Sequence, residues 1–143
     1  MIYWDTSCVI KLYTEEGDSG EWQQRACDAQ EQLVSSSLMR TESAFALEQK
    51  EHRGDILCGG ATALLEILDQ DIAAGRFNLF PVGEDVLNEA VTIAETCYHA
   101  SPVTLLRTPD GIHLATARLL RCTQIAAADD RMRTAAETLG LTL

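Results

Sequence analysis

The apolar residues of this chain follow two different periods. Short apolar runs of strand length alternate with longer segments in which apolar residues recur every three or four positions, the spacing of one helical face. Strands are expected at 1–5, 32–35, 77–82 and 124–128, with 141–143 as a candidate edge strand, and helices at 6–13, 21–30, 38–52, 56–74, 84–99, 108–120 and 130–139. This alternation predicts one α/β domain over residues 1–143, built around a mainly parallel sheet.

Two local patterns indicate core positions. Tyr3 and Trp4 alternate on the first strand, and we expect both rings in the core rather than stacked on nucleic-acid bases. In the helix expected at 84–99, one apolar stripe at helical spacing contains Val86, Leu87, Ala90, Val91, Ala94 and Cys97. This stripe predicts the buried face of that helix.

The charge of the chain limits its partners. The sequence has 22 acidic and 11 basic residues and a formal net charge of −11, so phosphates would be repelled over most of its surface. Either nucleic acid is not the substrate, or bound cations neutralise part of this charge. Nine of the basic residues are arginines, whose planar guanidinium groups suit bidentate contacts to phosphate.

Cysteine and histidine positions argue against a zinc site or a disulfide framework. The five cysteines are scattered without a C-x-x-C pair, and buried reduced thiols explain them best. The three histidines do not share a helical face at close spacing. No apolar run approaches the roughly 20 residues of a membrane span, and the first residues lack the features of a signal peptide. We therefore expect a cytoplasmic protein without membrane association.

Two aspartates directly follow predicted strands. Asp5 comes after the first strand and Asp129 after the strand at 124–128. Ligands of parallel sheets bind beyond the carboxyl ends of the strands, so these positions are candidates for a site. Each aspartate has a simpler explanation as the N-cap of the helix that follows, a role that Asp130 could also take.

Glu42 and Asp110 complete a set of four acids. Asp110 lies in the first turn of a helix that Thr108 is expected to cap, where the helix dipole favours a carboxylate, and it shares the apparent inner face with His113. Glu42 is the anomaly, because it lies inside its helix among the apolar neighbours Leu38, Met39, Phe45 and Ala46. A buried carboxylate needs a partner, which is either an arginine, with Arg40 and Arg107 as candidates, or a shared cation.

A shared cation would explain all four acids at once. Four carboxylates gathered at one edge of a sheet repel one another, and a bound cation removes that penalty. Oxygen ligands without cysteine or histidine favour a hard ion, which predicts one or two Mg²⁺ or Mn²⁺ ions. Such ions are often completed by substrate phosphates, so the acidity of the chain is compatible with a phosphodiester substrate. His113 is expected to be a buried, hydrogen-bonded histidine rather than a general base.

Four segments of the chain resemble PIN-domain proteins of the VapC toxin type. In order, these segments read MIYWDTSCVIKLYTEE, SSLMRTESAFAL, TPDGIHLATARLL and AAADDRMRTAAETLGL, and they span nearly the whole sequence. Carried over position by position, the acids of the PIN family fall on Asp5, Glu42, Asp110 and Asp129. One departure is Ala127, because many relatives carry threonine or serine two residues before the last aspartate, and it puts a hydroxyl contact to metal or water in doubt.

The resemblance implies a three-layer α/β/α fold around a mainly parallel sheet and metal-dependent cleavage of RNA. It also implies a homodimer and a VapB-type antitoxin partner. We expect Asp5 to be the central metal ligand, with Asp110 and Glu42 holding one ion and Asp129 completing a second position. Thr6 and Ser7 are expected to support the site or to cap the first helix, and Arg40 and Arg107 are candidate substrate contacts.

Two alternatives remain distinct from this interpretation. The chain could be a PIN-like module that binds partners without cleaving RNA, for which Ala127 is the only sequence support. A phosphotransferase of the haloacid-dehalogenase type also has an aspartate after its first strand. That chemistry needs a second aspartate two residues later, where this chain has Ser7, and a later lysine, whereas its only lysines are Lys11 and Lys50.

Overall fold

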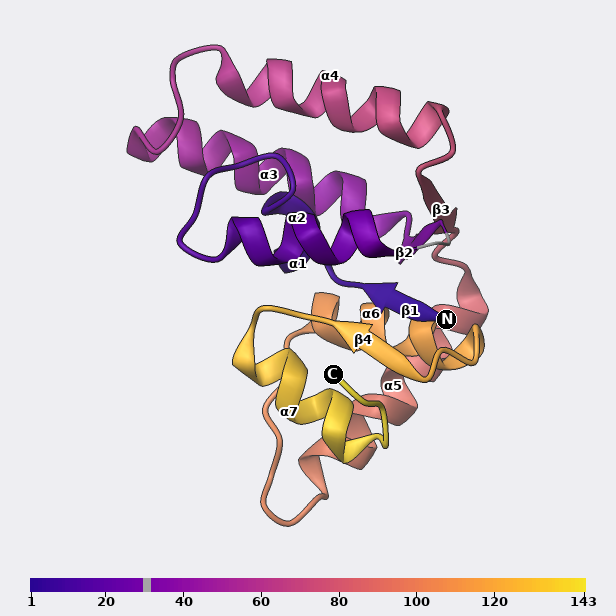
Figure 1. Cartoon of the computed structure of the whole chain (residues 1–143). Helices are drawn as coiled ribbons and strands as arrows, with labels where there is room; N and C mark the ends of the chain where they lie inside the picture. Colours follow the sequence, from indigo (N-terminus) through magenta and orange to yellow (C-terminus); the bar gives the residue numbers. More distant parts are fainter. Residues whose placement is uncertain (30–31) are drawn as a thin grey trace.

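A four-stranded parallel sheet forms the centre of the computed structural model, which describes residues 1–29 and 32–143 (Figure 1). The strands are β1 (Ile2–Trp4), β2 (Leu33–Ser36), β3 (Phe77–Phe80) and β4 (Gln124–Ala126). Their order in the sheet is β3-β2-β1-β4, with every neighbouring pair parallel. The chain thus runs from β1 outward to β3 and then returns to place β4 on the other side of β1.

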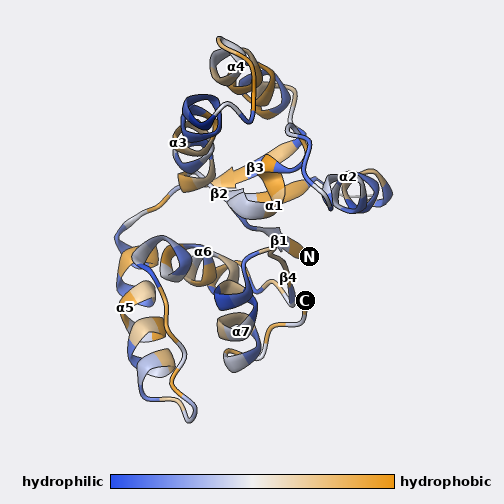
Figure 2. Cartoon of the chain, turned by 90° about the vertical axis from the view of Figure 1, so that its left-hand side faces the viewer, coloured by the Kyte–Doolittle hydropathy of each residue, from blue (hydrophilic) through white to orange (hydrophobic). Residues whose placement is uncertain are grey.

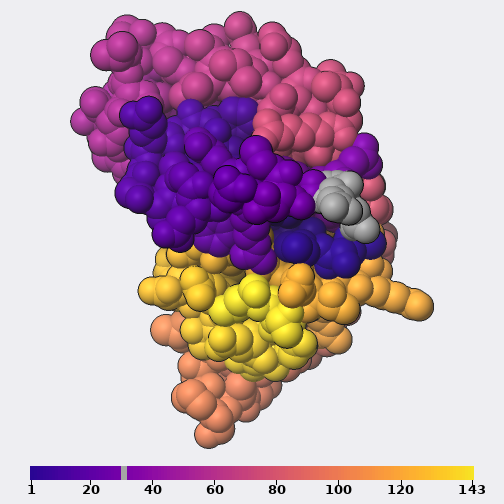
Figure 3. All heavy atoms as spheres, viewed as in Figure 1, coloured from indigo at the N-terminus to yellow at the C-terminus, as the bar shows by residue number. Residues whose placement is uncertain are grey.

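Helices cover both faces of the sheet. The helices of the N-terminal half are α1 (Thr6–Ile10), α2 (Ser19–Asp28), α3 (Leu38–Arg53) and α4 (Gly60–Ala73). Those of the C-terminal half are α5 (Glu84–Tyr98), α6 (Thr108–Leu119) and α7 (Asp130–Thr138). The first group lies above the sheet and the second below it in Figure 1, and the two halves of the chain form separate parts of the surface in Figure 3. The expected three-layer α/β/α fold is confirmed.

Successive side chains of β1 belong to different core clusters on the two faces of the sheet. Tyr3 of β1 belongs to the core cluster shared with α5, α6 and α7, whereas its neighbour Trp4 belongs to the cluster shared with α1, α3 and α4. Because successive side chains of a strand point to opposite faces, apolar neighbours such as these build two cores at once. Figure 2 shows the resulting apolar strands between the two helical layers.

Most expected elements are present, with differences at their ends. The helix expected at 56–74 begins at Gly60, because Gly59 takes a left-handed conformation with φ of 80° and Leu57 is 87% exposed in the preceding turn. The helix expected at 21–30 is α2, and its last predicted residue lies outside the described part of the chain. The candidate edge strand at 141–143 forms only one isolated bridge, between Thr142 and Gln124.

Two predictions about burial are partly wrong. All five cysteines are free thiols, but Cys27 and Cys58 are exposed rather than buried. On α5, Leu87 and Val91 are exposed, whereas Ile93 is completely buried. The predicted buried face of α5 is too wide, because α5 packs mainly on α6 and buries only the side facing that helix. Among the described residues, no helix is both long and apolar enough to span a membrane.

The contrast within α5 gives a direct test of the packing. Replacing Ile93 with alanine should lower the free energy of unfolding by about 2–5 kcal/mol, because it opens a cavity in the core. The matched change Val91→Ala, at a side chain that is 59% exposed, should stay within about 0.5 kcal/mol. Urea denaturation of both variants measures the difference, and equal losses would contradict this assignment of the buried face.

Candidate active site

The four predicted acids meet at the carboxyl end of the sheet. The arrowheads of β1 and β4 point to the same edge in Figure 1, and Figure 2 is viewed from that side. β2 and β4 flank β1 on opposite sides, so the strand order changes direction at β1. Parallel sheets bind ligands at such a topological switch point, beyond the carboxyl ends of the strands. Asp5 follows β1 and Asp129 lies three residues beyond β4, so two of the acids reach this place directly from the strands.

Asp5 is held in place by the start of α1. Its Oδ2 accepts hydrogen bonds from the backbone N–H of Ser7 at 3.1 Å and from the Ser7 hydroxyl at 2.5 Å, which makes Asp5 the N-cap of α1. The same Ser7 hydroxyl accepts the backbone N–H of Ala128 at 3.0 Å. Ser7 therefore connects the chain leaving β4 to the first acid, and its predicted supporting role has a geometric basis.

Asp129 is likewise a helix cap. Its carboxylate accepts the backbone N–H groups of Arg131 at 2.9 Å and Met132 at 3.3 Å at the start of α7. Partial burial would raise the pKa of Asp129, but these hydrogen bonds outweigh it and lower the pKa below its usual value. The capping explanation is correct for both aspartates, and both side chains nevertheless line the same pocket.

Arg107 forms a bidentate ion pair with Asp110. Its Nε lies 3.0 Å from Asp110 Oδ2 and its Nη2 lies 3.0 Å from Oδ1, and its backbone N–H also donates to Asp110 at 3.1 Å. The N-cap of α6 is Arg107, so the prediction that Thr108 caps this helix is wrong. Arg107 Nη2 also lies 3.6 Å from Asp129 Oδ2. The hydrogen bonds that Arg107 donates to Asp110, followed by the charges of Asp110, Asp129 and Asp5, raise the pKa of Arg107.

Glu42 has two polar partners, neither of which is an arginine. Its Oε2 accepts the Thr6 hydroxyl at 2.5 Å and the His113 Nε2–H at 2.7 Å. Burial alone would raise the pKa of Glu42, but the hydrogen bond and charge of His113, together with Thr6, lower it. Within the described residues Glu42 forms no arginine ion pair, so that explanation of its burial is wrong.

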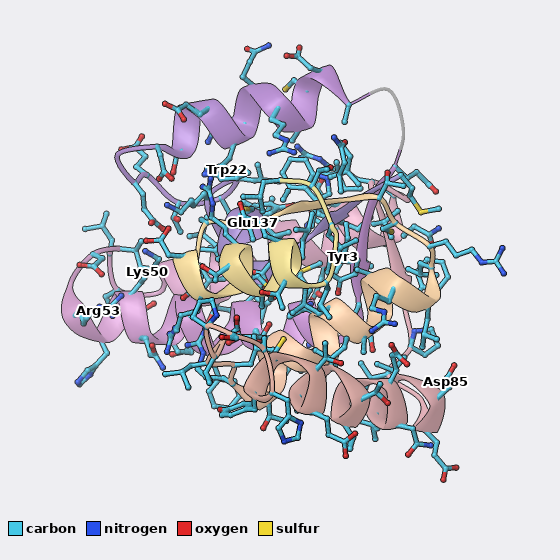
Figure 4. The ribbon with its side chains drawn as sticks, turned by 90° about the horizontal axis from the view of Figure 1, so that it is seen from below. Tyr3, Trp22, Lys50, Arg53, Asp85 and Glu137 are labelled. Atoms are coloured by element: carbon cyan, nitrogen blue, oxygen red, sulfur yellow. The ribbon has the colours of Figure 1, made fainter. Side chains whose placement is uncertain are left out.

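His113 connects this pair to the core. The ring is 1% exposed, and its Nδ1 lies 2.6 Å from the Tyr3 hydroxyl, which also accepts the Ser36 backbone N–H at 3.0 Å. Burial lowers the pKa of His113, whereas Glu42 and Asp5, whose Oδ1 lies 3.7 Å from Nε2, raise it above the usual value. Figure 4 labels Tyr3 near the middle of the molecule as seen from below. The expected buried, hydrogen-bonded His113 is confirmed, but no local pattern indicates Tyr3 as its partner, because the two residues lie 110 positions apart.

These groups enclose one pocket of about 320 Å³. Its lining comprises Asp5, Thr6, Ser7, Glu42, Phe45, Ala46, Gln49, Arg107, Asp110 and Asp129. All four acids expected from the sequence are therefore brought together, with Thr6, Ser7 and Arg107. Arg40 is not in this lining, because its guanidinium makes a two-pronged contact with Asp69 of α4 at 2.6 and 2.8 Å. Nothing in this geometry supports Arg40 as a substrate contact.

The donor set fits a hard divalent cation in its chemistry. Four carboxylates on one pocket supply the all-oxygen ligation that Mg²⁺ and Mn²⁺ prefer. In residues 1–29 and 32–143, no three acid, histidine or cysteine side chains are arranged to share one ion as they stand. The acids are turned toward Arg107, His113 and the helix N-termini instead, so hydrogen-bond donors of the chain satisfy the carboxylates.

Comparisons with known proteins identify the family and the fold of the chain. A family model described as the PIN domain matches residues 2–138. Ribonuclease VapC46 of Mycobacterium tuberculosis (strain ATCC 25618 / H37Rv) is 33% identical over 142 residues, which cover 98% of this chain and 93% of that protein. The crystal structure of M. tuberculosis VapC20, described as a toxin that cleaves the sarcin–ricin loop, superposes with a TM-score of 0.70 at 16% identity over the full length of both chains. This last likeness concerns the fold alone.

The contact between Tyr3 and His113 can be tested by removing one oxygen atom. The Tyr3→Phe variant leaves His113 Nδ1 and the Ser36 N–H without the phenol, so the free energy of unfolding should fall by about 1–3 kcal/mol. Tyr98→Phe is the matched control, because the Tyr98 side chain is 47% exposed and water can replace its bond to the Leu106 carbonyl. Chemical denaturation compares the two, and equal effects would contradict a stabilising role for this buried contact.

Proposed function

The chain belongs to the PIN-domain family and is of the VapC type, and we propose that it is a divalent-metal-dependent endoribonuclease that hydrolyses RNA phosphodiester bonds. In this proposal it is the toxin of a VapBC-type pair, works in the cytoplasm as a homodimer and is blocked by a VapB-type antitoxin. The ribonuclease name of the relative at 33% identity supports the activity. No membrane partner is part of the proposal.

The convergence of four acids on one pocket carries this proposal. Asp5, Asp129, Asp110 and Glu42 come from β1, β4, α6 and α3, far apart in sequence, and each is at least partly buried. Burying carboxylates near one another costs free energy, so stability alone does not favour such a cluster. A site that must attract a cation requires it.

The four carboxylates are the groups that would hold one or two Mg²⁺ or Mn²⁺ ions. When bound, such an ion neutralises charge on the phosphodiester and lowers the pKa of a bound water. Asp5 is the central acid, because Ser7 fixes its carboxylate and it faces both His113 and Arg107. Thr6 and His113 each form a hydrogen bond with the Glu42 carboxylate and so orient it toward the pocket.

Arg107 has a second role in this proposal. Its side chain is 55% exposed, whereas the Asp110 side chain is 7% exposed, so the guanidinium can move into water only if another cation takes over the charge of the buried carboxylate. A cation between the acids would release the guanidinium, which is then placed at the rim of the pocket to bind a phosphate oxygen of the substrate. Arg107 thus protects the acids from mutual repulsion before the substrate arrives.

The alternative of an inactive PIN-like module is not supported by the pocket. Its only sequence argument is Ala127, whose side chain is 3% exposed and packs in the core cluster with Met132 of α7. Ala127 does not line the carboxylate pocket.

The activity predicts a specific mutational result. Purified protein with Mn²⁺ should cleave RNA, and Asp5→Asn should reduce the rate at least about 100-fold, since even the residues that orient metal ligands are often worth 10- to 100-fold. Asp55→Asn is the matched control, because Asp55 pairs with Arg53 on an exposed turn outside the pocket. The rates are measured on total RNA and on short oligoribonucleotides.

Removing the metal gives the complementary result. Chelation by EDTA should abolish cleavage, and added Mn²⁺ should restore it, because the acids act through a bound cation. Cleavage that persists in EDTA, or that is unchanged in Asp5→Asn, would contradict the proposed mechanism and point to a contaminating nuclease.

A further inference from the structure

Phe45 lies in the open beside the carboxylate pocket. Its side chain is 68% exposed, and it lines the pocket that contains Asp5 and Glu42. Phe45 also lines a second hollow of about 500 Å³, together with Glu48, Gln49, His52 and Arg53. Because Phe45 and Gln49 belong to both linings, the two hollows adjoin along the outer face of α3.

Helical spacing explains this arrangement. Glu42, Phe45, Gln49 and His52 follow one another at three- and four-residue steps, so they form a single row along α3. The core side of the helix is formed by other residues, among them Met39, Ser43 and Leu47, which are buried. Phe45 therefore contributes little to holding α3 in place. A single exposed apolar residue is common, but this one starts a groove that begins at an acidic site.

The chemistry of this groove suits an uncharged, flat ligand. An aromatic ring offers a stacking surface, and the Gln49 amide next to it offers both a hydrogen-bond donor and an acceptor. Glu48 in the same lining repels phosphate, and Arg53 at the outer end of α3 is already paired with Asp55 (Figure 4). A chain with a net charge of −11 cannot rely on phosphate attraction for affinity, whereas stacking on a base does not depend on charge.

We propose that Phe45 and the hollow beside it hold the unpaired base of a nucleotide next to the scissile phosphate, with the base stacked on the Phe45 ring. This inference rests on the proposed ribonuclease function and names the residue that would contact a base of the substrate. A base that lies flat on Phe45 is not paired in a duplex, so the substrate is RNA that is single-stranded or looped out at the cleavage position. Gln49 is placed to contact the edge of that base.

Substrates that lack one base test this proposal. The cleavage position is first mapped on total RNA, and an oligoribonucleotide containing it is prepared intact and with an abasic ribose on either side of the scissile phosphate. On the intact substrate, Phe45→Ala should lower kcat/KM by about 5- to 150-fold, the range for losing one base–aromatic stack. Removing the correct base should cost the wild-type protein a similar factor, and Phe45→Ala should lose little more on that abasic substrate.

Control variants separate stacking from general damage. Phe45→Trp should keep most of the activity because it preserves an aromatic face, and Leu119→Ala, at another exposed apolar side chain, should leave kcat/KM unchanged. In EDTA, where no cleavage occurs, the fluorescence of the new tryptophan in Phe45→Trp should be quenched by the intact oligoribonucleotide more than by the abasic one. The wild-type protein, which retains Trp4 and Trp22, gives the background.

The outcomes distinguish this inference from the proposed function. If the wild-type protein cleaves RNA and Phe45→Ala cleaves equally well, or if the losses from the variant and the abasic site multiply, the base site is wrong and the nuclease stands. Unchanged cleavage with lost binding of a protein partner would assign Phe45 to a protein interface and also overturn the proposal. If no RNA is cleaved, the proposed function fails, and the base site, which rests on it, fails with it.

Discussion

The structure depends on how four carboxylates are kept together at one edge of a parallel sheet. Parallel strands end at the same edge, so residues that follow β1 and β4 meet there whatever their sequence separation. When those residues are acids, their mutual repulsion must be offset. Here the offset comes from two groups of the chain itself, the Arg107 guanidinium beside Asp110 and Asp129, and the His113 ring, which lies beside Asp5 and shares a hydrogen bond with Glu42.

The supporting groups serve stability and chemistry together. Asp5 and Asp129 cap helices and also face the pocket, so a structural role and a functional role are not exclusive for either residue. The buried contact from Tyr3 to His113 fixes the ring that orients Glu42. On the exposed side, the guanidinium of Arg107 reaches solvent, so in this proposal it can exchange places with a cation. The site is thus rigid toward the core and adaptable toward solvent.

The sequence predicted well whatever depends on local pattern. The alternation of strand-like runs and helical segments predicts the layers. Glu42 was identified from its apolar neighbours, but that argument was partly wrong, because Phe45 is 68% exposed and the Glu42 side chain is 27% exposed. The partner of Glu42 was missed, since His113 lies 71 positions away and an arginine was the more common choice. Arg40 was misjudged for the same reason, because its proximity to Glu42 in sequence says nothing of Asp69 on α4. The width of the buried stripe on α5 depended on how α6 packs against it, and no periodicity within α5 records that.

Locating Mn²⁺ in crystals of the protein through its anomalous scattering tests the proposed cation site most directly. The central claim is that the four acids are a cation site in which Arg107 holds the place of the ion. We predict an anomalous peak in the pocket within coordination distance of Asp5 and Asp110, with the guanidinium of Arg107 moved off Asp110. A map without a peak among these acids at saturating Mn²⁺, with Arg107 still bound to Asp110, would contradict it.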